Sequence, residues 1–585
     1  MKTKILIIVI CNLIICNLLI AQNITNTLGT CGVFTLKDNA TTYLSVSQST
    51  GYLSLNRSLV LPNTTGSTVG VIYKGADRFI HNYGTQNTFV GLNSGNFTMT
   101  GVTNTAFGVF SLSENTIGSQ NAAFGVASLT HNTTGENNSA FGTYSLFNNA
   151  SGTENSAFGL ASMEYNVGGN LNSAFGSFSL HSNSTGNNNS SFGTRSLFSN
   201  TTGNYNSALG SNSLYNNSTG SSNTGIGTFV LYANTNGSNN TAVGQESMRI
   251  NNGSFNSAIG GYSLYYNTAG NYNVAIGYYS LNTNSTGSNN TAIGTYSMRS
   301  NINGTQNTAL GETSLYSNTS GTQNTAVGFG SLFSNTLNPG NTAVGWNALY
   351  LNTGWNNTAV GHHSLNSNTT GNYNTALGYN AGSTVTTGLN LTLIGIDANP
   401  STGTANDQVT LGNGFVSSLR CNVQTITSLS DARDKKNISE LSLGLDFITK
   451  LHPRQFNWDK REWYDDNVSD GSKMNEAPTA GFIAQELDSA QTTAGADWLN
   501  LVLKDNPEKW EATYGNLLPV MVKAIQELKA EKDELSKGLL AEKNKNESLE
   551  IRLSKYELMQ NILVKKLEEL ESKTSEVKKV KLSEK

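Results

Sequence analysis

A serine and a lysine stand five positions apart, Ser430 and Lys435, within the polar segment 429–438. A serine hydroxyl is a weak nucleophile until a neighbouring group takes its proton. A lysine can take that proton only when burial or nearby positive charge lowers its pKa. Arg433 and Lys436 are candidate positive neighbours, and association of several chains could supply the burial. Such a pair is frequent by chance, so it indicates nucleophilic chemistry only in company with other signals.

Those signals are short motifs that follow in order along the chain. They are Leu451-His452-Pro453, Phe456-Asn457-Trp458, the segment Gly481–Glu486, and then Tyr514, Leu517, Pro519, Lys523 and Ala524. With the segment 429–438, the series resembles the intramolecular chaperone domain of phage endosialidases and tail fibres, the self-cleaving peptidase family S74. The resemblance covers about residues 430–528.

The resemblance implies a single-turnover cut between Leu429 and Ser430, with Ser430 as nucleophile and Lys435 as its base. The hydroxyl would attack the Leu429 carbonyl to give an ester that water opens, while backbone donors steady the oxyanion. Asp431 and Arg433 would support the site, and we favour a structural ion pair for these two residues. Gly481–Glu486 is interpreted as a packing segment rather than a second site.

The body of the chain repeats one motif nineteen times between residues 87 and 395, with a reference glycine at nearly fixed spacing. Sixteen steps are 17 residues long and two are 16. The glycines are Gly91, Gly108, Gly125, Gly142, Gly159, Gly176, Gly193, Gly210, Gly227, Gly244, Gly260, Gly277, Gly294, Gly311, Gly328, Gly345, Gly361, Gly378 and Gly395. A unit this short cannot enclose a core, so each unit must stack on copies of itself as a β-solenoid.

The two short steps indicate which part of the unit is structural. Both lose a residue from the turn, at 251–253 and 352–354, where other units have an Asn-Thr-Thr-Gly-like sequence. Deletions are tolerated in exposed backbone, so we expect the Asn-x-x-Gly part to be loop and the Ala-Val-Gly-x-x-Ser-Leu part to be packed. β-Branched or aromatic residues before the glycine, such as Val243 and Phe175, predict two short strands and two turns per unit.

Charge is scarce in the repeats. Between Gly91 and Gly395 the charged residues are Glu114, Glu136, Glu154, Glu164, Arg195, Glu246, Arg249, Arg299 and Glu312. Stacked identical coils would place like charges one strand spacing apart, whereas Asn, Ser and Thr can hydrogen-bond along a ladder. The units resemble the Asn-Ser-Val-Ala-Ile-Gly repeats in the heads of trimeric autotransporter adhesins, most closely at 256–260 and 273–277.

The amino-terminal region has the pattern of an exported protein. Residues 1–21 combine Lys2 and Lys4 with a long apolar run, which predicts a secretory signal peptide of bacterial type rather than a lasting membrane span. An uncleaved anchor is the alternative. Cys31 and Cys421 flank the repeats, and we expect them to be free or paired between chains. Residues 22–86 predict a β cap for the solenoid.

From Ile525 onward, apolar positions alternate at spacings of three and four as far as Val577, which predicts a coiled coil over 525–578. Its polar core members, including Lys532 and Asn546, can fix register and strand number. Sequence does not choose between two and three strands, but both resemblances imply three. The tail 579–585 is basic, and 25 of the 35 Lys and Arg residues lie in 430–585.

These observations predict an all-β repetitive solenoid, trimeric as a fibre, followed by a small α+β domain and a helical coiled coil. The expected divisions are the signal peptide (1–21), the β cap (22–86), the repeat fibre (87–399), a connector (400–429), the chaperone domain (430–524), the coiled coil (525–578) and the basic tail (579–585). Long repeats can pair out of register, so alignment needs a nucleus outside them. Cleavage would then remove the nucleus and trap the fibre.

The expected function is an exported, adhesin-like homotrimeric fibre, secreted or at the cell surface, with a glycan or cell-surface ligand. The alternative is a glycan-degrading spike enzyme. Glycoside cleavage needs two carboxylates close together, and only Glu136 and Glu154, on adjacent coils, merit checking. No cofactor or metal is expected, since acidic ligands are missing from the repeats. Nucleic-acid binding is disfavoured because the fibre has no basic stripe.

Overall fold

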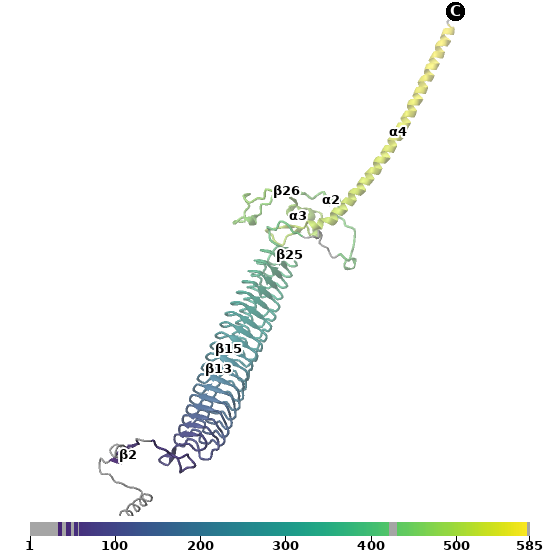
Figure 1. Cartoon of the computed structure of the whole chain (residues 1–585). Helices are drawn as coiled ribbons and strands as arrows, with labels where there is room; N and C mark the ends of the chain where they lie inside the picture. The colour runs from purple at the N-terminus through teal and green to yellow at the C-terminus, as the bar shows by residue number, and fades with distance from the viewer. Residues whose placement is uncertain (1–32, 38–41, 48–51, 56–57, 421–429, 582–585) are drawn as a thin grey trace, which may run out of the picture. The chain divides into compact units, whose positions relative to one another are not determined.

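The structure is a computed structural model that describes residues 33–37, 42–47, 52–55, 58–420 and 430–581 (Figure 1). The chain divides into two compact units, residues 1–330 and 331–585. The expected signal peptide, Cys31, Cys421 and Leu429 lie outside the described residues.

The first unit begins with two antiparallel sheet elements. β1 (Val33–Lys37), β2 (Thr42–Ser47) and β3 (Leu53–Leu55) form one sheet in that order. β4 (Ile72–Lys74) and β5 (Asp77–His81) form a hairpin, and β5 also pairs antiparallel with β6 (Thr88–Val90), the first strand of the repeats. This pairing covers the edge of β6, which would otherwise present unpaired backbone groups.

The repeats of the first unit form a parallel ladder of three-residue strands, which Figure 1 shows stacked one on the next around β13 and β15. Each strand pairs in register with the strand one repeat away, as β10 does with β9 and β11. The strands are β6 (Thr88–Val90), β7 (Thr105–Phe107), β8 (Ala122–Phe124), β9 (Ser139–Phe141), β10 (Ser156–Phe158), β11 (Ser173–Phe175), β12 (Ser190–Phe192), β13 (Ser207–Leu209), β14 (Thr224–Ile226), β15 (Thr241–Val243), β16 (Ser257–Ile259), β17 (Val274–Ile276), β18 (Thr291–Ile293), β19 (Thr308–Leu310) and β20 (Thr325–Val327).

Each repeat contains one strand, so the expectation of two strands per unit is wrong. The part that follows the glycine is a series of turns in which alternate residues have positive φ, such as Phe178 at 57° and Leu180 at 51°. Because of this alternation, successive peptide groups point along the direction in which the coils stack. Phe178 N–H therefore donates to Leu160 O at 2.8 Å, and Leu180 N–H donates to Ser196 O at 2.9 Å. The backbone is hydrogen-bonded between coils without β geometry.

The turn asparagines are buried, so the expectation of an exposed Asn-x-x-Gly loop is wrong for the asparagine. Asn183 is fully buried and its Nδ2 donates to Asn166 Oδ1 at 2.7 Å and to Gly186 O at 2.9 Å. The shortened turn keeps this pattern, because Asn251 Nδ2 donates to Gly253 O at 2.9 Å. A buried amide must find partners, and the neighbouring coil supplies them. The expected ladder of hydrogen bonds is confirmed.

The reference glycines are required by close approach between coils. Gly260 has φ of 129°, and a Cβ there would lie 2.7 Å from the carbonyl oxygen of Gly277 on the next coil. A side chain at this position meets backbone, which cannot move aside. The middle residue of each strand and the leucine or methionine after the glycine fill the interior, as Ala275 and Leu281 do.

The second unit contains the remaining repeat strands, the α+β domain and a long helix. Its repeat strands are β21 (Thr342–Val344), β22 (Thr358–Val360), β23 (Thr375–Leu377), β24 (Thr392–Ile394) and β25 (Val409–Leu411), paired parallel in that order. The domain comprises 3-10 helix η1 (Ala432–Asp434), α2 (Leu445–Ile448), β26 (Arg454–Phe456), η2 (Arg461–Trp463), β27 (Thr479–Gly481), α3 (Ala484–Thr493), η3 (Asp497–Leu499), β28 (Val502–Leu503), β29 (Glu511–Ala512) and η4 (Tyr514–Leu517).

The domain has its own small core. β26 pairs antiparallel with β27, and β28 pairs with β29. The core side chains are Phe447, Leu451, Leu487, Ala496, Leu499, Leu501, Val502, Leu517 and Val520. Val520 belongs to α4 (Leu518–Lys581), so this helix begins inside the core before it extends away from it.

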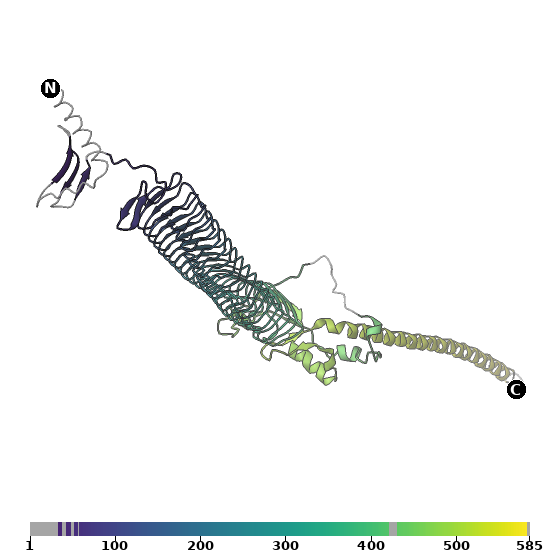
Figure 2. The ribbon, with the colours of Figure 1, turned by 90° about the horizontal axis from the view of Figure 1, so that it is seen from below.

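Helix α4 is continuous over 64 residues, which Figure 2 shows as one unbroken coil. Beyond its first turns its apolar seam is exposed, with Leu535 and Leu539 both about three-quarters accessible. An isolated helix gains little from such side chains, and the spacing of this seam is the one that the sequence predicts for a coiled coil. Within the described part of the chain, no helix has the length and apolar character to cross a membrane.

Adjacent glycines give a matched test of the coil contact. Gly260→Ala places a methyl group against backbone at positive φ, and should destabilise the repeats by about 1–3 kcal/mol or more. Gly261→Ala is the control, since its Cβ would make ordinary van der Waals contacts, 3.5 Å from the Tyr278 ring and 3.8 Å from Gln245 O. Thermal unfolding followed by circular dichroism should show a lower midpoint for Gly260→Ala alone. Equal midpoints for the two variants would contradict the proposed close contact.

Candidate functional site

The structure brings together Ser430, Asp431, Arg433 and Lys435 at η1. The Asp431 side chain caps this short helix by accepting the Arg433 backbone N–H at 2.8 Å. The turn folds Lys435 back towards Ser430: Lys435 Nζ donates to Ser430 Oγ and lies 3.4 Å from Ser430 O. The nucleophile and base that the resemblance implies are thus hydrogen-bonded to each other. Leu429, the other side of the expected cut, is outside the described residues.

Asp431 and Arg433 form an ion pair, as expected from the sequence. Arg433 Nη2 lies 2.6 Å from Asp431 Oδ2, and Arg433 Nε also donates to Asp431. Hydrogen bonds from Arg433 lower the pKa of Asp431, and the carboxylate raises the pKa of Arg433 in return. The Arg433 guanidinium is therefore paired with Asp431 and does not act as a positive neighbour of Lys435. Of the two positive neighbours considered from sequence, Lys436 remains.

The whole segment from Ser430 to Glu440 is exposed on the single chain. A lysine in water holds its proton, so a lysine base needs surroundings that disfavour the charge. The single chain supplies the contact between Ser430 and Lys435 but not the burial.

Helix α4 contacts α2, which begins ten residues after Lys435. Glu527 Oε2, on α4, accepts the Leu445 backbone N–H at 2.6 Å. The first N–H groups of a helix have no partner within it, so this carboxylate stabilises the start of α2. The sequence motifs did not identify Glu527, because its partner lies 82 positions away.

The motif segments identified from sequence make contacts that hold the domain together. Arg454 on β26 and Glu486 on α3 form an ion pair of 2.7 Å, which lowers the pKa of Glu486. Tyr514 Oη accepts the Phe482 N–H at 3.1 Å. Leu517 and Ala524 are buried. These contacts agree with a packing role for Gly481–Glu486.

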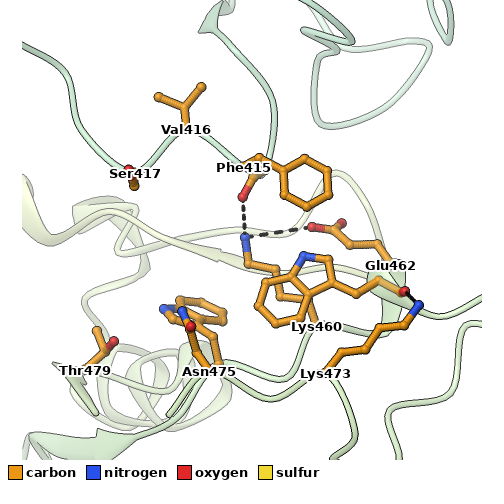
Figure 3. A pocket seen from close by; sticks show the side chains of 11 residues that line it. Phe415, Val416, Ser417, Lys460, Glu462, Lys473, Asn475 and Thr479 are labelled. Carbon is orange, nitrogen blue, oxygen red and sulfur yellow. Dashed lines mark hydrogen bonds and ion pairs between the residues drawn. The ribbon is translucent and has the colours of Figure 1, made fainter. Parts of the chain in front are cut away.

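A cavity of about 970 Å³ lies beside the chain that leads to the expected cut (Figure 3). Lys460 is at its centre: Nζ donates to Gly414 O at 2.9 Å and lies 5.2 and 5.6 Å from the ring centroids of Trp458 and Trp463. Its ion pair with Glu462 is 3.9 Å long. The domain therefore holds the connector, a contact that the sequence did not reveal because the connector lacks a motif.

The carboxylates considered for glycoside cleavage, Glu136 and Glu154, belong to the repeats and not to the chaperone domain. Glu136 and Glu154 are both exposed at turns, and their backbones are joined by a hydrogen bond of 2.9 Å. A general acid in a glycosidase needs a raised pKa, which usually comes from burial in a cleft. The side chains of Glu136 and Glu154 are exposed rather than buried in a cleft.

Residues 430–496 match the family model described as chaperone of endosialidase. The match begins at Ser430 and includes η1, α2, β26, β27 and α3. Comparison with curated proteins and with solved structures gives no match for the chain. The resemblance noted from sequence is confirmed for this segment, and a β-solenoid followed by such a domain fits a role in the assembly of a tail fibre or spike.

The contact between Glu527 and α2 can be tested by calorimetry on the full chain. Glu527→Ala removes the acceptor for Leu445 N–H and should destabilise the domain by about 1 kcal/mol. Glu527→Gln keeps an oxygen at that position and should recover part of the loss. Glu531→Ala, at an exposed position one turn later on α4, is the control. An unchanged domain transition in Glu527→Ala would contradict the role assigned to this carboxylate.

Proposed function

We propose that the chain is an exported homotrimeric fibre, adhesin-like and secreted or on a bacterial surface, whose chaperone domain assembles it and then cuts itself away. The observation that carries the proposal is the Lys435–Ser430 hydrogen bond at the first residue of the segment that matches the chaperone family. The uncharged repeats suit a ligand on another surface, such as a glycan.

The proposed reaction is an acyl shift followed by hydrolysis. Ser430 Oγ attacks the carbonyl carbon of Leu429 while Lys435 Nζ takes the hydroxyl proton. The C–O bond forms, the C–N bond breaks, and the Ser430 nitrogen leaves as an amine with a proton returned from Lys435. Water then opens the ester to give a carboxylate at Leu429 and regenerates the Ser430 hydroxyl. The products are the fibre and a fragment that begins at Ser430.

Assembly is proposed to precede the cut. The dyad segment is exposed on a single chain, and the seam of α4 is exposed as well. When three α4 helices pair, they bring three copies of the domain together, and packing among them can desolvate Lys435. Glu527 on α4 accepts the Leu445 N–H, so the helix that pairs holds the start of α2, which follows Lys435 by ten residues. Cleavage would therefore report completed assembly.

Loss of the fragment makes assembly irreversible. The remaining coils are held by hydrogen bonds and packing between neighbours, and the seam that aligned the chains is gone. A fibre in this state persists because unfolding is slow, whatever its equilibrium stability.

Two matched pairs of variants test the dyad. Ser430→Ala and Lys435→Ala should each lower the rate of cleavage by roughly 10²-fold or more, since each removes a reacting group. Ser439→Ala, at an exposed position of the same segment, and Lys450→Ala, at an exposed position just after α2, are the matched controls. Gel electrophoresis and amino-terminal sequencing should show the new terminus at Ser430 in the controls only. A fragment beginning at Ser430 in Lys435→Ala at the normal rate would refute the assigned base.

If assembly precedes cleavage, substitutions that disrupt the apolar seam of α4 should block both assembly and cleavage. Leu535→Asp with Leu539→Asp places charges at positions that a coiled coil would bury, so the chain should stay monomeric and uncut. Lys537→Asp, at an exposed position between them, should assemble and cut normally. Light scattering gives the mass and electrophoresis the extent of cleavage. A monomeric double variant that still cuts would show that assembly is not required.

A further inference from the structure

The third residue of every repeat strand forms an apolar column on the outside of the coils. In β6 to β24 the middle residue of each strand is buried and the third points outward, as Ala275 and Ile276 do. In the first unit the column is Val90, Phe107, Phe124, Phe141, Phe158, Phe175, Phe192, Leu209, Ile226, Val243, Ile259, Ile276, Ile293, Leu310 and Val327. The strands β21 to β24 carry Val344, Val360, Leu377 and Ile394 at the same position.

Every member of this column is a large apolar residue, and the most accessible ones expose between 37% and 52% of their surface. Its first six phenylalanines stack ring on ring, with centroids 4.7–5.1 Å apart from Phe107 to Phe192. A long apolar stripe is unusual on a monomer in water and marks a contact surface.

Other outward positions of the same repeat are not restricted in this way. The residue after the reference glycine is Ser177 in one unit, Gln245 in another and Glu312 in a third. The next position holds Arg195 and Glu246. All nine charged residues between Gly91 and Gly395 lie outside the apolar column. If the apolar column faced only water, polar residues would be allowed there as they are at other outward positions. We therefore expect the column to contact a partner rather than water.

The partner must repeat with the spacing of the coils. A globular ligand would contact only a few coils, and the third residue of the other strands would then be free to be polar. The column is apolar in all fifteen strands of the first unit and again in β21 to β24. The surface with the same repeat along its length is that of a second copy of this chain. Helix α4 has an unpartnered seam too, so self-association is needed there on separate grounds.

We propose that the apolar column is the surface along which the copies of the chain pack, each third residue facing its counterparts in the other copies. The inference rests on the proposed homotrimer and adds the contact surface and the register. Charge is absent from the column because a charge there would meet its own copies at close range without water.

Cysteine cross-linking tests the contact on the full chain. In a background of Cys11→Ser, Cys16→Ser, Cys31→Ser and Cys421→Ser, Ile276→Cys is treated with a short bifunctional maleimide. Leu310→Cys provides a second site. Tyr278→Cys is the control, on the same coil but outside the column and more exposed than Ile276. The facing thiols have a high effective concentration, so the column variants should cross-link between chains about tenfold more than the control or better.

A mixing experiment tests the register. Chains with Ile276→Cys and chains with Ile293→Cys, carrying different tags, are assembled together and oxidised. A disulfide is used because it joins only Cβ atoms about 4 Å apart, and an offset of one coil adds about 4.8 Å. Aligned copies give cross-links within each kind of chain and few between kinds.

The outcomes separate this inference from the proposed function. A trimer by light scattering, with Ile276→Cys and Leu310→Cys cross-linking no better than Tyr278→Cys, overturns the contact surface and leaves the homotrimer standing. Abundant cross-links between the two kinds of chain overturn the register. A monomer by light scattering contradicts the proposed function, and the contact surface fails with it.

Discussion

Each coil of this protein rests on the next through the same few contacts. A reference glycine lies against the backbone of the following coil, a buried asparagine donates to its counterpart, and a short strand pairs in register. Such contacts are satisfied between any two coils of the repeat. The ladder is therefore strong along a chain yet carries no information about which coil of another chain lies opposite. This degeneracy is the problem that the rest of the molecule has to solve.

The carboxyl-terminal part differs from the repeats in every respect that matters for this problem. Its core side chains occur once each, and its dyad is a single turn at η1. Its helix α4 carries polar residues such as Lys532 and Asn546 at positions that the sequence predicts for the core of a coiled coil. A non-repeating structure can align chains in only one way. The contact of Lys460 with Gly414 joins this structure to the chain before the expected cut, and Glu527 joins α4 to α2 after it. Alignment and cleavage can thus depend on each other.

Much of this could be predicted from sequence, because period and motif order are visible along the chain. The reference glycines predicted the stacked coils, and the ordered motifs from Ser430 predicted the chaperone domain. The second strand of each unit was predicted wrongly, since positive φ at leucine and phenylalanine is unfavourable in isolation and is imposed by hydrogen bonds between coils. The burial of Asn183 and the contacts of Lys460 and Glu527 depend on residues far apart, which spacing alone cannot reveal.

The dependence of cleavage on chain concentration tests the central claim most directly. Denatured full-length chain would be refolded at a series of concentrations, and the appearance of the Ser430 amino terminus would be followed together with the mass of the uncut species. If the dyad acts only after the chains have joined, the rate of cleavage rises with concentration in the dilute range and the cut appears in the associated fraction. A rate that is the same at every concentration, with cutting in monomeric chains, would contradict the account.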